Sequence, residues 1–171
     1  VDARVNSAGI RRDGMFHKMT FDQWSAGMKT NLDAAFTCTG PVSDGMRNRG
    51  FGRIVNISSI NGQKGQMGQV NYSAAKAGDI GFVKALAQEG ARAGITVNAI
   101  SLSTLEPPMD AEQKAAFMAS DRVKAQLSRY AIRRYGTPDD VAGMALFLCS
   151  DAGSWITGQT YPVNGGYSFA V

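Results

Sequence analysis

The sequence places a tyrosine and a lysine four residues apart, in the run Tyr72-Ser73-Ala74-Ala75-Lys76. On a helix, this spacing puts both side chains on one face. A neighbouring ammonium group stabilises a phenolate, so it lowers the pKa of a tyrosine from its ordinary value of about 10. Such a tyrosine is a usable general acid near neutral pH. Because an ordinary helix surface carries the same short pattern by chance, the surrounding residues must decide what the pair does.

Two further polar residues are candidates for the same chemistry. Ser59 stands thirteen positions before Tyr72 and directly follows the β-rich run 53–58. Open α/β sheets bind ligands at the carboxyl ends of their parallel strands, so a hydroxyl there can hydrogen-bond a substrate carbonyl beside the tyrosine. Asn31 lies in an otherwise apolar helical stretch. Taken alone, it is equally well a satisfied polar residue or the site of a kink.

The elements that must position these residues alternate between strands and helices. β-rich runs predict strands at residues 3–6, 53–58, 95–100 and 159–163, and hydrophobic periodicity predicts helices over 20–49, 72–92 and 137–148. Residues 62–68 are predicted to form a Gly-rich loop, and residues 104–135 to be irregular and then helical. This alternation predicts an α/β fold whose parallel sheet is covered by helices on both faces. The strands are expected to hold Val5, Val55, Val97 and Tyr161.

Local signals mark where the helices begin and end. Thr20 and Thr137 are predicted N-caps, and Gly94 is predicted to end the helix over 72–92. Gly40-Pro41 falls inside the stretch 20–49. Proline has no amide hydrogen and clashes with the preceding turn, so we expect a break or kink there.

The composition favours an ordinary globular protein over a nucleic-acid-binding, disulfide-rich or membrane protein. The 171 residues are 44% hydrophobic and 19% charged, which fits one globular domain. The net charge of +4 is scattered, so a nucleic-acid partner is not expected. Only two cysteines occur, far apart, which argues against a disulfide framework or a metal site and suggests a reducing cytoplasm. No apolar run approaches the ~20 residues that span a bilayer, so no membrane segment is expected.

In order and spacing, the motifs along the chain resemble the signatures of the short-chain dehydrogenase/reductase family. The resemblance covers essentially the whole chain. It implies a single domain over residues 1–171 with a Rossmann-like, doubly wound parallel sheet. The chain would be the C-terminal two-thirds of that domain, without its N-terminal Gly-rich cofactor-binding segment. The matching segments are Asn6-Ser7-Ala8-Gly9, Thr30-Asn31-Leu32, residues 52–59, Tyr72 with Lys76, Val97-Asn98, residues 136–142, Thr157-Gly158-Gln159 and Asn164-Gly165-Gly166.

The resemblance implies a role for each matching catalytic position. Tyr72 would protonate the alkoxide as hydride arrives at a carbonyl carbon. Lys76 would lower the pKa of Tyr72 and hold the ribose hydroxyls of a nicotinamide cofactor. Ser59 would fix the carbonyl oxygen, and Asn31 would anchor a water that links Lys76 to solvent.

The same resemblance implies a cofactor, NADP or alternatively NAD. The residues expected to bind it are Asn6, Ala8, Gly9 and Leu105, together with Tyr72 and Lys76. Leu102-Ser103 stands where the family has Pro-Gly, and Pro107 stands where it has threonine. These positions border the nicotinamide in the family, so the departures are expected to alter that edge of the cofactor site.

Residues 61–72 and the run Lys18-Met19-Thr20 are similar to the acetoacetyl-CoA reductases of polyhydroxybutyrate synthesis, a branch of that family. This narrower resemblance implies NADP-dependent reduction of a 3-oxoacyl thioester, with Gln66 and Gln69 near the acyl substrate. Two alternatives remain within the family, a 3-oxoacyl-carrier-protein reductase and another short-chain alcohol dehydrogenase. A non-catalytic scaffold is the alternative of a different class. The family also implies a homo-tetramer or homo-dimer.

Overall fold

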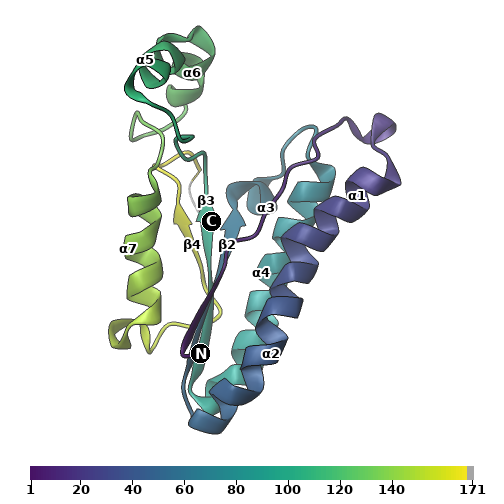
Figure 1. The fold of residues 1–171 in the computed structure, drawn as a ribbon, viewed down its shortest axis with the longest axis vertical. Helices are drawn as coiled ribbons and strands as arrows, with labels where there is room; N and C mark the ends of the chain where they lie inside the picture. The colour runs from purple at the N-terminus through teal and green to yellow at the C-terminus, as the bar shows by residue number, and fades with distance from the viewer. Residues whose placement is uncertain (169–171) are drawn as a thin grey trace.

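A four-stranded parallel sheet with helices on both faces forms the described part of the chain, residues 1–168 of this computed structural model (Figure 1). The strands β1 (Ala3–Asn6), β2 (Gly52–Ser59), β3 (Ile95–Leu102) and β4 (Thr160–Val163) lie side by side in that order. Each neighbouring pair is parallel, with Val5 opposite Val55 and Ile100 opposite Tyr161. The predicted α/β fold with a parallel sheet is therefore confirmed.

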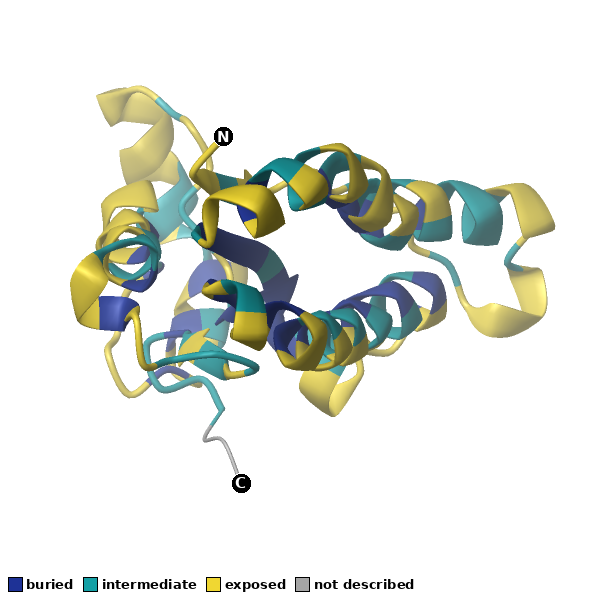
Figure 2. Cartoon of the chain, turned by 90° about the horizontal axis from the view of Figure 1, so that it is seen from below, coloured by how far each residue is buried: buried dark blue, intermediate teal, exposed yellow. Residues whose placement is uncertain are grey.

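Helices α1 (Phe21–Met28), α2 (Ala34–Arg49) and α4 (Val70–Gly90) lie on one side of the sheet, and α7 (Pro138–Cys149) lies on the other (Figure 1). Successive side chains of a strand point to opposite faces, so β2 and β3 feed two cores. Ile54 and Val97 pack with Met46 and Val83 in the first core. The second core, under α7, consists of Val55, Ile100, Val141 and Leu148. Figure 2 shows the buried strands between the two helical layers.

We expected a break or kink at Gly40-Pro41, and the helix does not break there, because α2 continues through Pro41. Pro41 is exposed, so water can reach the carbonyl that loses its hydrogen-bond donor there. The helical stretch is instead disturbed further upstream, where a π-helical turn, η2 (Lys29–Asp33), joins α1 to α2. Such turns are rare in proteins, and those that occur are often at functional sites. This one contains Asn31.

The predicted Gly-rich loop begins as a short helix, α3 (Ile60–Lys64), so the prediction is correct only for its later residues. Gly65 and Gly68 have φ of 71° and 78°, the left-handed region that favours glycine. Gly62 has a different reason to be glycine. A Cβ added there would lie 2.6 Å from the backbone carbonyl carbon of Lys76, so only glycine lets α3 approach α4 this closely.

The predicted helix ends agree with the structure. Thr20 and Thr137 each form a capping box with the residue three positions later, Gln23 and Asp140 respectively. The α4 helix ends in a 3₁₀ turn, η3 (Ala91–Ala93), and Gly94 closes it with φ of 68°. Similar short turns, η1 (Phe16–Lys18) and η4 (Asp151–Gly153), occur in the connections. No helix of the described part is both long and apolar enough to cross a membrane.

Residues 104–136 leave the sheet after β3 and carry α5 (Ala111–Ala119) and α6 (Asp121–Leu127), which lie beyond the end of the sheet (Figure 1). This excursion has a core of its own, made of Val123, Leu127, Tyr130 and Tyr135. Its two ends meet, because the Glu106 amide donates to the Gly136 carbonyl at 2.8 Å. The predicted irregular and then helical character is confirmed up to Leu127, and residues 128–135 are irregular again.

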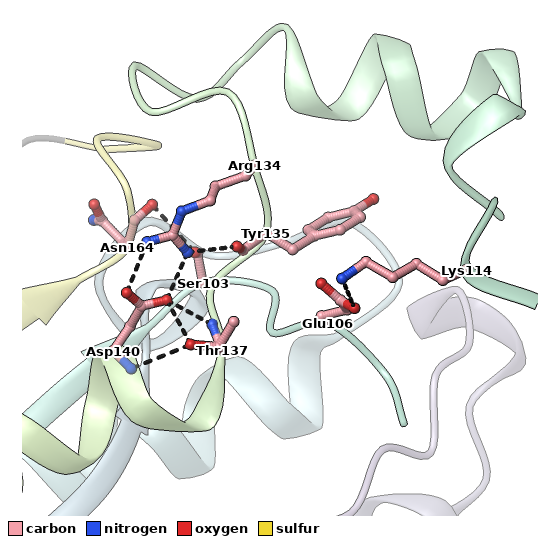
Figure 3. A network of polar contacts seen from close by, with 8 residues as sticks. All are labelled: Ser103, Glu106, Lys114, Arg134, Tyr135, Thr137, Asp140 and Asn164. Atoms are coloured by element: carbon pink, nitrogen blue, oxygen red, sulfur yellow. Dashed lines mark hydrogen bonds and ion pairs between the residues drawn. The ribbon is translucent and has the colours of Figure 1, made fainter. Parts of the chain in front are cut away.

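Polar contacts tie the base of the excursion to α7 and to the loop after β4 (Figure 3). The Arg134 guanidinium donates two hydrogen bonds to the Asp140 carboxylate, at 2.6 and 2.7 Å. These bonds, with two more from Thr137, hold the pKa of Asp140 far below its ordinary value. The Ser103 hydroxyl donates to the Asn164 carbonyl at 3.1 Å. The ends of the excursion are therefore fixed although its middle stands away from the sheet.

Candidate active site

A cavity of about 280 Å³ lies where β1, β2 and β3 end, and it brings together Ser59, Tyr72 and Lys76. Residues 7–11 line it from the segment after β1, and residues 57–59 line it from the end of β2. Leu102 and Ser103, which depart from the family pattern, line it from the end of β3. All these segments follow carboxyl ends of parallel strands, which is where open α/β sheets bind ligands.

Tyr72 reaches the cavity from the first turn of α4, which the buried side chain of Asn71 holds in place. The Asn71 amide group donates to the backbone carbonyls of Arg12 and Gln23, each at 3.0 Å. The Asn71 side-chain oxygen accepts from the Tyr72 amide at 2.8 Å. Asn71 has 0% exposure, so its polar atoms depend on these partners. This residue ties the start of α4 to α1 and to the loop after β1.

Burial is the main influence on the acidity of Tyr72, and it raises the pKa of the phenol above the ordinary value. Hydrogen bonding by the Ser59 side chain and the positive charge of Arg11 lower the pKa, while Asp13 and Asp79 raise it. The net direction is opposite to the lowering that the sequence predicts from Lys76. In this state of the protein Tyr72 is a neutral phenol at neutral pH, which is the form that can donate a proton.

Lys76 lies one helical turn after Tyr72 and is 5% exposed. Its ammonium donates to the Ile57 carbonyl at 2.7 Å, so the end of β2 fixes its position. Burial lowers the pKa of Lys76, and the negative charge of Asp79 opposes that effect. The backbone of Lys76 is also held, because the Ser58 hydroxyl donates to its carbonyl at 3.1 Å. The amino group thus sits on a rigid support between the cavity and the helical layer.

Ser59 ends β2 and is the N-cap of α3, where its hydroxyl oxygen accepts from the Asn61 amide at 3.1 Å. It is 7% exposed. A hydroxyl that accepts one hydrogen bond still has a hydrogen to donate. Ser59 can therefore donate toward the cavity, to a substrate carbonyl or to Tyr72, while its position is fixed by the cap.

Asn31 adjoins a second cavity of about 30 Å³, which Lys76 also lines. That volume holds one or two water molecules, at roughly 10–15 Å³ each. The Asn31 side chain itself is engaged by the protein: its amide group donates to the carbonyls of Ile10 and Gly27, at 2.9 and 2.8 Å. Its oxygen accepts from the Ile10 amide at 3.0 Å. The structure thus brings Asn31 close to Lys76, and its side chain pins the segment that forms the cavity wall.

The residues predicted to bind a cofactor separate into two groups. Ala8 and Gly9 line the larger cavity. Asn6 lines the smaller one, and its amide group donates to Thr39 and Asn56. Leu105 is not among the lining residues of either cavity, and its backbone forms a bridge with Gly136 instead. The structure therefore brings Asn6, Ala8 and Gly9 to the site but leaves Leu105 at the base of the excursion.

The two glutamines predicted to contact substrate do not line either cavity. The Gln69 side chain is buried, donates to the Asp13 carboxylate at 2.9 Å and accepts from Asn61 at 2.8 Å. Gln66 is exposed and accepts from the Lys64 ammonium at 3.1 Å. Gln69 thus fixes the loop before α4 to the loop after β1, and Gln66 lies on the open surface.

Sequence reasoning missed Asp79, which is 2% exposed and lines the smaller cavity with Lys76. The Asn56 side chain donates to its carboxylate at 2.6 Å. A signal for it was available, because Asp79 follows Lys76 by three positions and lies four residues from both Ala75 and Val83. Those residues form the buried face of the helix, so an acidic residue among them needed a partner inside the protein.

The larger cavity fits the nicotinamide end of a dinucleotide cofactor. Of the three N–H groups of the Lys76 ammonium, one donates to Ile57, which leaves donors for ribose hydroxyls. At Gly9 an added Cβ would come within 3.2 Å of the Asn31 side-chain oxygen, so the Gly9 backbone packs closely against Asn31. These residues would hold the cofactor there.

Comparison with known proteins agrees with this geometry. Residues 1–168 match the sequence family described as enoyl-(acyl carrier protein) reductase. The acetoacetyl-CoA reductase of Shinella zoogloeoides is 55% identical over 169 residues, which are 99% of this chain and 68% of the relative. That of Rhizobium meliloti (strain 1021) is 55% identical over 99% of the chain and 69% of the relative. A 3-oxoacyl-[acyl-carrier-protein] reductase of Synechocystis is 42% identical over 97% of the chain and 64% of the relative. The chain belongs to the short-chain dehydrogenase/reductase family of oxidoreductases.

Proposed function

We propose that the full-length protein containing residues 1–171 reduces a 3-oxoacyl thioester, acetoacetyl-CoA foremost, to the 3-hydroxyacyl thioester. The observation that carries the proposal is the convergence of Ser59, Tyr72 and Lys76 on one cavity at the carboxyl ends of the strands. The high identity to two acetoacetyl-CoA reductases supports the choice of substrate. The proposed reductant is NADPH, with NADH as the alternative.

The cofactor, when bound, supplies the hydride for the carbonyl carbon. Lys76 holds the ribose through its free N–H donors, and Ala8 and Gly9 offer a main-chain surface beside it. Asn6 acts less directly, because its amide group ties the end of β1 to β2 and α2 through Asn56 and Thr39.

The protein residues then control the carbonyl oxygen and one proton. Ser59 donates a hydrogen bond to the oxygen and fixes its position. Tyr72 gives its phenolic proton to that oxygen as negative charge develops on it, which is general acid catalysis. Because burial keeps Tyr72 protonated in the free protein, the acid is ready before substrate arrives. The positive charge of Lys76 stabilises the phenolate that is left.

The tyrosine must recover its proton after each turnover. The water-sized cavity between Lys76 and Asn31 offers a route, since the Lys76 ammonium can give a proton to the phenolate and water there can return one from solvent to the resulting amine. Both amide hydrogens of Asn31 are used by Ile10 and Gly27. Asn31 therefore supports the water through its main chain or the remaining lone pair of its side-chain oxygen.

We also propose that residues 1–171 belong to one domain, whose dinucleotide site is completed by a Gly-rich segment, and that this protein forms a cytoplasmic homo-dimer or homo-tetramer. Large apolar side chains on the α1–α2 layer support the assembly. Phe21 is 78% exposed and Phe36 is 69% exposed. Burying such side chains against a second copy removes apolar surface from water.

The proposed activity is tested by following NADPH oxidation with acetoacetyl-CoA and with the same acyl group on acyl carrier protein. We expect turnover with both thioesters, and a kcat/KM at least about tenfold higher for the CoA ester, a difference of roughly 1.4 kcal/mol in transition-state binding. A preference for the carrier-protein thioester would favour the function that the Synechocystis relative carries in its name. Oxidation of neither NADPH nor NADH with either thioester would overturn the proposal and leave two alternatives, another short-chain alcohol dehydrogenase and the scaffold.

A further inference from the structure

Asp79 is a buried carboxylate that the reduction mechanism above does not use. It is 2% exposed and lies three residues after Lys76 on α4, on the wall of the smaller cavity. A carboxylate taken out of water costs free energy unless positive charge or hydrogen bonds compensate it. The groups around Asp79 should therefore include the positive charge or hydrogen-bond donors that compensate its burial.

A chain of hydrogen bonds holds this carboxylate from the sheet side. The Asn56 amide group donates to Asp79 Oδ1 at 2.6 Å, and the Asn56 side-chain oxygen accepts from Asn6 at 2.8 Å. Asn6 also donates to the Thr39 hydroxyl at 2.9 Å. Residues from β1, β2 and α2 thus fix one oxygen of Asp79. Burial raises the pKa of Asp79, and the positive charge of Lys76 and the hydrogen bond from Asn56 oppose that effect and favour the carboxylate.

The charged and titratable groups around it are few. From α4 itself come Lys76 and, one turn earlier, Tyr72. Arg4 of β1 and Cys38 of α2 line the same cavity as Asp79. The Arg4 Nε–H donates to the Asn6 side-chain oxygen at 2.8 Å, so Arg4 joins the hydrogen-bond chain at Asn6 and not at the carboxylate itself. Arg11 and Asp13, after β1, act on Tyr72 from the other side. Asp79 is the acidic residue among those that line this cavity with Lys76, and it lies one turn later on the same helix.

We propose that Asp79 is a positioning residue of the reductase site: its carboxylate, fixed by Asn56, supplies the negative charge that keeps Lys76 an ammonium while Lys76 is buried. This inference rests on the proposed function of Lys76 and extends it. In this arrangement the Ile57 carbonyl fixes the position of the Lys76 amino group, and Asp79 favours the protonated form of that group.

The direction of the effect follows from the two influences on Lys76. Burial lowers the pKa of Lys76, and Asp79 raises it. Removing the negative charge therefore lets Lys76 lose its proton at a lower pH, and the functions that need the ammonium fail at a lower pH. At acid pH both forms of the protein carry the ammonium, so the difference disappears. A purely structural defect would instead be similar at every pH.

The test measures NADPH affinity against pH in the full-length protein that carries Tyr72→Phe, so that titration of the tyrosine does not contribute. In this background we compare Asp79 with Asp79→Asn. We expect the midpoint of the affinity loss at rising pH to move down by about one pH unit in Asp79→Asn. Glu89→Gln is the matched control, because it removes an exposed carboxylate from the same helix, and it should leave the midpoint unchanged.

A second variant keeps the proposal testable if Asp79→Asn misfolds. Asp79→Ser has a hydroxyl that can accept from Asn56 but carries no charge, and the same shift is expected of it. An affinity curve parallel to that of the Tyr72→Phe parent at all pH values overturns the role of Asp79. Lys76→Ala distinguishes this failure from that of the proposed function: if Lys76→Ala leaves NADPH affinity and its pH dependence unchanged, the role of Lys76 itself is wrong.

Discussion

Replacing Tyr72 with phenylalanine is expected to lower kcat for acetoacetyl-CoA reduction by about 10²–10⁴-fold, the usual cost of losing a general acid. The substitution keeps the ring and removes only the hydroxyl of Tyr72, which lines the larger cavity together with Ser59 and Lys76. The fold should be retained, because α4 begins on contacts made by Asn71 and the backbone rather than on the phenol. Steady-state NADPH oxidation measures the loss.

The control for this variant is Tyr161→Phe. Tyr161 lies on β4 and packs in the core under α7, away from the residues that line either cavity. Its loss of a hydroxyl should leave kcat within about a factor of a few, since turnover does not use it. If Tyr72→Phe kept turnover near that of Tyr161→Phe, Tyr72 would not be the proton donor.

Replacing Lys76 with alanine is expected to weaken NADPH binding by about 10- to 100-fold, the cost of one or more hydrogen bonds from a charged donor, and to lower kcat as well. Lys76 lines both cavities, so removing its side chain takes away the proposed ribose contact and the proposed proton route together. Calorimetry gives the affinity, and steady-state assays give kcat. Lys84→Ala, exposed two turns later on α4, is the matched control.

The combined variant Tyr72→Phe/Lys76→Ala tests whether the two residues act as one unit. Its loss in kcat should be close to that of the more damaging single change, because a missing proton donor cannot be impaired again by removing its partner. Losses that multiply fully would show that the two residues contribute independently. That outcome would contradict the mechanism, even if each single variant were slow.

Elements whose causes are local were predictable from the sequence. Thr20 and Thr137 are N-caps because their side chains accept from an amide three residues later, which needs no information from elsewhere in the fold. Gly94 ends its helix for an equally local reason, its left-handed backbone. The parallel sheet followed from the alternation of strands and helices, and the Tyr72–Lys76 pair from spacing on one helix.

The features that the sequence did not reveal depend on contacts between parts of the chain that are distant in sequence. The helix continues through Pro41, which lies on an exposed side of it. The π-helical turn contains Asn31, whose side chain forms hydrogen bonds with Ile10, 21 residues earlier in the sequence. The role of Gln69 as a substrate contact stays a prediction, and the hydrogen bonds of its side chain to Asn61 and Asp13 could not be read from the sequence. Which polar side chain faces a cavity depends on packing across several elements, and local patterns carry little of that information.

The central claim, that this cavity transfers hydride to a 3-oxoacyl thioester, is tested most directly by an isotope. The full-length protein is incubated with acetoacetyl-CoA and a nicotinamide cofactor that carries deuterium on one face of C4, in separate reactions for each face. We expect 3-hydroxybutyryl-CoA with one deuterium at C3 from one of the two labelled cofactors, and almost none with Tyr72→Phe over the same time. Product without deuterium from either cofactor, or no product at all, would contradict it.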